Sequence, residues 1–381
     1  MNLSLPRAAT AAAVGLASFV GLASFVGVAA APAAADTHHW RNVSPAGIHD
    51  SVLFDVEIAG GATWAVGARS DATTRPFAPV ALRWTGTRWQ APPQPAEHGR
   101  LDDLAVGAPD QVWAVGTRNE EVGEDDWDRG RALLQHWNGK AWRAVELPFP
   151  KGAQDTSLSA VDVDARGRVW VHGGYTDPSG EYLPALFRGR ADGSGGWTRL
   201  PADTGLTWVS QLEVGPDGVA LAIGDGVARF DGRAWTKDKL PSELDGAMYD
   251  GIERRSANEI WAVGHIRDEN LWRRPVVIRF DGRTWSVVRT PAETGQLFDL
   301  AFDGSGRPVI VGQTMNPAVN PAGNYILTLG PDGRLKRTEN PRGAGFLYGA
   351  ATDEAGRVWT VGGASGAEGG ISTSPYAGIR R

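Results

Sequence analysis

Trp-Ala-Val-Gly occurs three times in the chain, at Trp64–Gly67, Trp113–Gly116 and Trp261–Gly264. Four degenerate copies keep the final glycine, and they stand at 170–173, 221–224, 309–312 and 359–362. Counted from their first residues, the seven copies follow one another at intervals of 40 to 57 residues. Such a period is typical of repeat architectures in which each unit buries its faces against its neighbours. We therefore expect seven repeats that together cover almost the whole chain.

A second motif alternates with the first and places a tryptophan after a tight turn, at 85–89, 138–142, 231–235 and 281–285. With Trp40, Trp197 and the degenerate Lys336, it also occurs seven times. Asn-Gly and Asp-Gly are strong hairpin signals, so the turn joins the third and outer strands of each unit. In the sixth unit we expect strands over 297–302, 308–312, 325–329 and 335–338. The sequence thus predicts an all-β fold, a seven-bladed β-propeller of four-stranded antiparallel blades.

The two ends of the repeat region predict how the ring closes. The first unit begins with an outer strand at 39–44 around Trp40, and the last unit stops at a third strand over 376–381. The last blade therefore lacks its own outer strand, and we expect the N-terminal strand to supply it. This arrangement leaves no unpaired sheet edge at the seam.

Residues 1–35 are typical of a secretion signal peptide, because Arg7 is their only charge and small residues end the apolar stretch. The run from Ala8 to Ala35 is also long enough for an uncleaved membrane anchor. We favour cleavage near Ala33 or Ala35, because the closing strand begins only a few residues later. This predicts a secreted, extracellular protein with one domain, 36–381, and no membrane contact after cleavage.

Charge and cysteine content exclude several classes of partner. Lys and Arg number 38 and Asp and Glu 44, which gives a net charge of −6. Nucleic acid is not expected as a partner, because binding it requires a basic surface that displaces counterions. The chain has no Cys, so neither disulfides nor a lipid-modified cysteine can stabilise or anchor it. We expect a monomer whose stability comes from its core.

Three elements resemble known propeller families. The inner strand at 297–303 resembles the inner-strand signature of WD-repeat propellers, although their Trp-Asp dipeptide is absent. The turn at 281–285 resembles the Asp-box turn of sialidase-type propellers, one residue shorter between Asp and Gly. The Trp-Ala-Val-Gly repeats and the His-Trp-Asn-Gly element at 136–139 add to this resemblance. Together these features make the chain most similar to the Trp-rich repeat propellers secreted by high-GC Gram-positive bacteria. The resemblance covers 39–381 and implies the fold; such families include scaffolds, lectins and enzymes.

Catalytic signatures are missing from the sequence: it has no nucleophile elbow, no zinc-protease motif and no P-loop. A sialidase-like site would need an arginine cluster in the central mouth, but only Arg100 lies near an inner-strand start, and Arg254 lies toward the far end of its strand. A streptogramin-lyase-like site would need a His with a Glu near a metal, and no such pair can be assigned. The alternative function is an extracellular polysaccharide hydrolase or lyase that uses Asp102, Asp250 and Asp299 at the channel mouth. Paired glycosidase carboxyls would have to lie about 5 to 9.5 Å apart.

Thirteen of the 16 tryptophans fit the repeat and are expected to pack between blades. The other three, Trp127, Trp208 and Trp272, fall in connections that share one face of a propeller. Inner-strand starts add further aromatic rings to this face, at Phe54, Phe298, Phe346 and Tyr348. Such rings favour a platform for a glycan or a protein, although they could instead pack onto their own loops. We therefore expect a non-catalytic binding protein; a structural propeller in a cell-surface assembly is a third reading.

The same face carries an acidic loop around Trp127, with carboxylates at Glu124, Asp125, Asp126 and Asp128. Calcium prefers several oxygen ligands held by a turn, so this loop is the one candidate metal site. Its spacing does not match the EF-hand pattern, and a charge run is usually a solvated loop. We therefore expect no cofactor. On the opposite face, recurrence of the Asp-Gly turn predicts that Asp231 and Asp281 stabilise turns.

Overall fold

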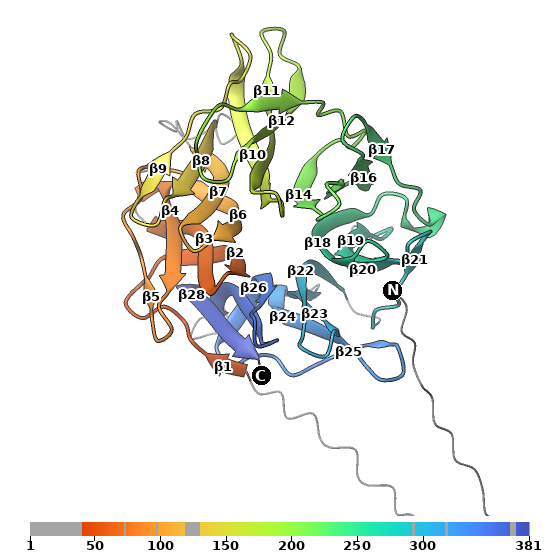
Figure 1. Ribbon diagram of the computed structural model, residues 1–381. Coiled ribbons are helices and arrows are strands. Elements are labelled where there is room, and N and C mark those ends of the chain that lie inside the picture. Colours follow the sequence, from red (N-terminus) through yellow and green to blue (C-terminus); the bar gives the residue numbers. More distant parts are fainter. Residues whose placement is uncertain are drawn as a thin grey trace, which may run out of the picture. The chain divides into compact units, whose positions relative to one another are not determined.

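The computed structural model describes residues 40–71, 74–96, 98–118, 130–270, 272–291, 294–316, 319–365 and 371–380. These residues form seven four-stranded antiparallel sheets, arranged as the blades of a β-propeller ring (Figure 1). The predicted fold is therefore confirmed. The described residues include one short 3-10 helix, η1 (Ser242–Leu244), and no helix that is long and apolar enough to cross a membrane.

The four strands of each blade run from the centre of the ring outward (Figure 1). The inner strands are β2 (Ser51–Ala59), β6 (Arg100–Ala108), β10 (Gln154–Val163), β14 (Val209–Val214), β18 (Met248–Ser256), β22 (Gly295–Phe302) and β26 (Ala344–Thr352). The second strands are β3 (Ala62–Asp71), β7 (Gln111–Arg118), β11 (Arg168–Thr176), β15 (Ala220–Gly224), β19 (Glu259–Arg267), β23 (Pro308–Asn316) and β27 (Val358–Ser365).

The third strands are β4 (Thr74–Trp84), β8 (Arg131–Trp137), β12 (Tyr182–Arg190), β16 (Val227–Phe230), β20 (Arg273–Phe280), β24 (Val319–Leu329) and β28 (Ile371–Arg380). The outer strands are β5 (Trp89–Gln90), β9 (Trp142–Ala144), β13 (Thr198–Leu200), β17 (Trp235–Lys237), β21 (Trp285–Val287), β25 (Leu335–Arg337) and β1 (Trp40–Asn42). We number the blades 1 to 7, beginning with the blade whose inner strand is β2.

Blade 7 takes its outer strand from the other end of the chain, as predicted. Strand β1 pairs with β28, and Trp40 lies opposite Arg380 (Figure 1). The pairing continues past the strand, because the Val43 amide donates to the Ala377 carbonyl over 2.9 Å. The ring is thus closed by main-chain hydrogen bonds between its first and last strands.

The repeated tryptophans pack one blade against the next, also as predicted. Trp64 of blade 1 is fully buried, and its ring lies 5.1 Å from Trp137 and 5.2 Å from Trp142 of blade 2. Trp359 of blade 7 contacts Trp84 and Trp89 of blade 1 in the same way. A buried indole removes about 200 Å² from water, which is worth about 5 kcal/mol. The interblade tryptophans therefore contribute much of the stability of the ring.

Aspartates hold the turns that precede second strands and the turns that follow third strands. One oxygen of Asp281 accepts hydrogen bonds from the amides of Arg283 and Thr284, both at 2.9 Å, which confirms its predicted role. Asp231 accepts two amides in the same way. A further aspartate, Asp353, was not predicted: it accepts the indole N–H of the blade-packing Trp359 over 2.9 Å. The turns and the interblade core are therefore linked.

Candidate binding site at the channel mouth

Each inner strand contains a bulge, and the bulge explains the glycine of the repeat. In blade 5, Tyr249 pairs with Gly264 and Gly251 with Val263, which leaves Asp250 as the extra residue. A methyl group on Gly264 would lie 2.0 Å from the Met248 carbonyl oxygen, so only glycine fits opposite the bulge. The same pairing recurs in all seven blades.

The bulge residues lie near the starts of the inner strands, where the connections from the preceding blades arrive. We call this ring of seven residues the channel mouth: Phe54, Asp102, Ser159, Ser210, Asp250, Phe298 and Tyr348. Blades 6, 7 and 1 supply aromatic rings, and blades 2 to 5 supply polar side chains. The mouth therefore has an apolar side and a polar side.

The apolar side is a contiguous cluster centred on Tyr348. Its ring lies 4.7 Å from Phe298, 5.2 Å from Phe346 and 5.6 Å from Phe54, with tilted or edge-on geometry. Phe54, Phe298 and Tyr348 remain partly exposed, whereas Phe346 is buried. The structure thus brings together the four aromatic residues that the sequence placed at the rim, and three of them can touch a ligand.

The polar side is centred on Asp250, whose partners the sequence did not reveal. One carboxylate oxygen of Asp250 lies 3.2 Å from Nδ1 of His265 and accepts a hydrogen bond from Nε2 of Gln296 over 3.0 Å. Arg273 donates in turn to the Gln296 side chain. Only 4% of His265 is exposed, and its Nε2 has no hydrogen-bond partner among the described residues. This network joins blades 5 and 6.

The other polar bulge residues have separate partners. The Asp102 carboxylate lies 3.0 Å from Nε of Arg100, and burial raises the Asp102 pKa despite this cation. Ser159 contacts Nδ1 of His172 at 3.2 Å, and burial lowers the pKa of that histidine to about 4. His172 is therefore neutral at physiological pH.

In blades 1, 2, 4 and 6 the residue after the bulge accepts a main-chain amide of the next inner strand. Asp55 accepts the Leu104 amide of blade 2 over 3.0 Å, and Asp299 accepts the Ala350 amide of blade 7 over 2.8 Å. Asp299 also accepts its neighbouring Leu300 amide, so both of its oxygens are used by the main chain. Among the described residues, Asp102, Asp250 and Asp299 have separate hydrogen-bond partners, and the three belong to blades 2, 5 and 6.

Further carboxylates follow deeper in the channel. Burial, and then repulsion from Asp162, raise the pKa of Glu253 to about 7. Burial raises the pKa of Asp162 to about 6, and burial with repulsion from Asp55 and Glu253 raises that of Glu57 well above its usual range. Among the described residues, no three His, Asp or Glu side chains could together hold a metal ion. The channel below the mouth is thus acidic, and its acids repel one another.

The tryptophans that the repeat left unexplained have different environments. Trp208 directly precedes β14 and is 36% exposed. Trp272 lies between β19 and β20, is partly buried, and donates its amide to Asp268 over 3.0 Å. Trp127 and the candidate calcium ligands Glu124, Asp125, Asp126 and Asp128 lie outside the described residues.

No protein-family model matches the chain, and no curated protein matches it either. Solved structures do match. A catalytically inactive virginiamycin B lyase from Staphylococcus aureus with quinupristin is 12% identical over 90% of this chain and 99% of its own, with a TM-score of 0.59. YCF48 bound to D1 peptide is 14% identical over 91% and 97%, with a TM-score of 0.57. The WD40 β-propeller domain of Doa1 is 9% identical over 90% and 97%, with a TM-score of 0.55. At these identities the likeness concerns the fold alone.

Proposed function

We propose that this protein is a binding propeller that recognises a segment of another protein at its channel mouth, without catalysing a reaction there. The grouping of Phe54, Phe298 and Tyr348 carries this proposal. Three blades contribute these rings to one partly exposed cluster beside a polar wall, and apolar surface with a few oriented polar groups is typical of ligand sites. Among the similar folds, YCF48 is seen with a bound peptide.

The geometry favours a protein segment over a glycan. The rings around Tyr348 meet at 54° to 73°, so they form ridges that suit apolar side chains rather than one flat surface for a sugar face. Beside them, in blade 5, Asp250 offers a carboxylate that can accept peptide amides or a basic side chain.

To test this, peptides that bind the full chain are selected from a displayed library, and the affinity of each peptide for the protein is measured by calorimetry. We expect Phe298→Ala to weaken binding at least about tenfold, because a hot-spot aromatic side chain is worth about 2 kcal/mol or more. Trp208→Ala and Trp272→Ala should weaken it as well, since both residues lie in connections on the same face. Arg283, which is exposed in the hairpin turn on the opposite face, supplies the control Arg283→Ala.

Equal affinity for the wild type and Phe298→Ala would refute the assignment of the mouth. Binding on a glycan array, lost in Phe298→Ala, would keep the mouth as the site but replace the protein ligand with a sugar. A ligand from the peptide library therefore supports a protein partner, and a ligand from the glycan array supports a sugar.

Cleavage of a polysaccharide is the second candidate function, and the contact between Asp250 and His265 supports it. The partly exposed carboxylate of Asp250 can act as a general base at the mouth, and its contact with the buried His265 orients it. Release of reducing or unsaturated ends from cell-wall polysaccharides, lost in Asp250→Asn, would establish this activity. Absence of release from every substrate that binds would reject it.

We also propose that residues 1–35 direct export and are removed. The apolar segment with a single basic residue and small residues at its end supports this. N-terminal sequencing of a C-terminally tagged protein from the culture medium should begin near Asp36. Retention of the tag in the membrane fraction with an intact N-terminus would refute cleavage.

A further inference from the structure

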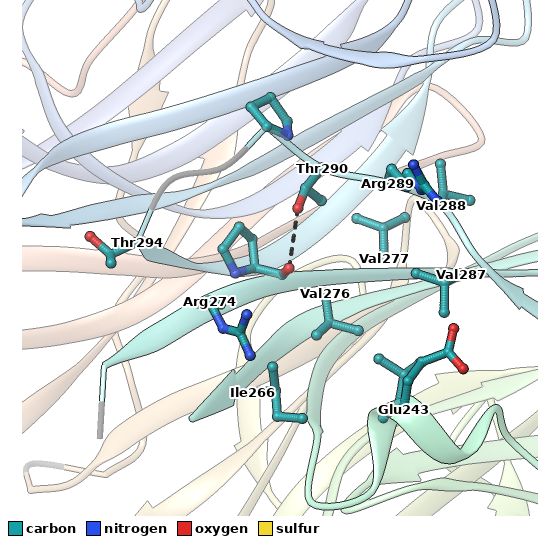
Figure 2. A pocket seen from close by; sticks show the side chains of 13 residues that line it. Glu243, Ile266, Arg274, Val276, Val277, Val287, Val288, Arg289, Thr290 and Thr294 are labelled. Carbon is teal, nitrogen blue, oxygen red and sulfur yellow. Dashed lines mark hydrogen bonds between the residues drawn. The ribbon is translucent and has the colours of Figure 1, made fainter. Parts of the chain in front are cut away.

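A second concave surface lies away from the channel mouth, at the outer part of blade 5 (Figure 2). This groove has a volume of about 540 Å³, within the range of ligand sites. Its walls come from η1 on the connection from blade 4, from the strands β19, β20 and β21, and from residues 288–291 and Thr294 of the connection to blade 6. The Thr290 hydroxyl donates to the Pro275 carbonyl over 3.3 Å and holds that connection against β20.

The floor of the groove is apolar. Val276 and Val287 form it with Leu244 and Ile266, and the neighbouring Val277 and Val288, which pack toward blade 6, complete the lining (Figure 2). Val287 is 36% exposed and is one of three large apolar side chains that are exposed among the described residues. The groove therefore leaves apolar surface in contact with water, which a partner would cover.

Two arginines flank this floor. Figure 2 shows Arg274 near Ile266 and Arg289 beside Val288, so the guanidinium groups lie at different ends of the valine row. Both are exposed, and neither has an ion-pair or hydrogen-bond partner among the described residues. Glu243, beside Val287, is the one carboxylate among the described lining residues. A ligand that satisfies both arginines must carry two negative groups separated by apolar ones.

We propose that this groove binds an extended acidic peptide segment of a partner protein, in which apolar side chains lie between two carboxylates. The apolar side chains would cover the valine floor, and each carboxylate would pair with Arg274 or Arg289, whose planar guanidinium groups suit bidentate pairing. We choose this occupant because its two carboxylates complement the charges of the two arginines. Glu243 disfavours a third carboxylate at the end of the groove beside Val287. The site is separate from the channel mouth and does not depend on the function proposed for it.

The test uses a synthetic array of five-residue peptides with Val, Ile or Leu at the three central positions. Both terminal side chains are Asp, Asn or Lys, and binding to the full chain is measured by fluorescence anisotropy. We expect the Asp peptides to bind about tenfold more tightly than the Lys peptides, since each exposed pair contributes up to about a factor of five. The preference should decrease as salt is added.

Reversal of both charges, R274E with R289E, should reverse the order so that the Lys peptides bind more tightly. Val287→Asp should weaken binding of the Asp peptides by adding a like charge to the floor. Arg283→Glu, at an equally exposed arginine in the hairpin turn of the same blade, is the control and should change nothing. Phe298→Ala should also bind the Asp peptides normally, which separates this site from the mouth.

Equal binding of the Asp and Lys peptides, or an order that R274E with R289E does not reverse, would overturn the proposal. So would binding of the small apolar anion anilinonaphthalene sulfonate at Val287 without binding of any peptide, because the groove would then be a small-molecule site.

Discussion

Replacing Glu253 by Gln should stabilise the protein at alkaline pH and change it little at acidic pH. Burial in the channel, followed by repulsion from Asp162, raises the pKa of Glu253 from 4.5 to about 7. Between these values the folded protein keeps a proton that the unfolded chain has released. The stability that this proton provides is fully present below pH 4.5 and is lost as the pH rises through 7.

The size of the effect follows from the two pKa values. The difference between a pKa of 4.5 and one of about 7 corresponds to about 3 kcal/mol, because each tenfold change in an equilibrium constant is worth about 1.4 kcal/mol. The ionised Glu253 thus lowers the free energy of unfolding by about 3 kcal/mol at pH 8 and by less than about 1 kcal/mol at pH 5. Gln has nearly the shape of protonated Glu and cannot ionise, so the variant should be more stable than the wild type by these amounts.

Urea denaturation of the full chain, followed by tryptophan fluorescence at pH 5 and pH 8, measures the difference. Glu146→Gln supplies a control, because Glu146 is exposed between β9 and β10 and should behave alike at both pH values. If Glu253→Gln is no more stable than the wild type at pH 8, ionised Glu253 is not disfavoured in the folded state. The interpretation of the channel as a set of mutually repelling buried acids would then be wrong.

Three further substitutions test the elements that build the ring. Gly264→Ala should cost at least about 2 kcal/mol, because its methyl would overlap a main-chain carbonyl; Gly196→Ala, where a methyl meets nothing within 4 Å, should cost far less in the same denaturation experiment. Trp64→Ala should lower the free energy of unfolding by about 3 to 5 kcal/mol, and calorimetry should show a correspondingly lower Tm. Asp353→Ala should cost about 2 kcal/mol, because it removes the acceptor of a buried indole. Burial raises the pKa of Asp353, but the hydrogen bonds that it accepts bring the pKa below 3.8 overall. Its contribution is therefore present above pH 3.8 and lost as the pH falls through the lower folded-state value, so wild type and Asp353→Ala should converge in acid.

The sequence predicts the blades because a physical requirement repeats with them. Every unit places a glycine where the inner-strand carbonyl approaches, so Gly264 has equivalents throughout. Five of the seven units also place an indole at the position of Trp64, where two blades meet. The aromatic side of the mouth is predictable for the same reason, since Phe298 and Tyr348 occupy the same register position in adjacent blades.

The polar side of the mouth could not be predicted in this way. Asp250 meets His265 and Gln296 from positions 15 and 46 residues away, and none of the three belongs to the repeat. The available signal was a departure from the pattern: His265 directly follows the repeat glycine, where the other six units have Ala, Thr, Gly, Asp, Gln and Gly. Asp299 was read as a candidate catalytic carboxylate, but its two main-chain hydrogen bonds depend on the neighbouring blade, which sequence spacing does not reveal.

The pairing of β1 with β28 has a consequence for the order of events during synthesis. Ser44 and Ala377 contact each other although 333 residues separate them, so the first strand to leave the ribosome is the last to find its partner. Until Arg380 has been made, blade 7 has an open edge and Trp40 has no sheet to join. Contacts between distant residues slow folding. A circular permutant that places Trp40–Asn42 after Arg380 would convert this closure into a local hairpin and should fold faster.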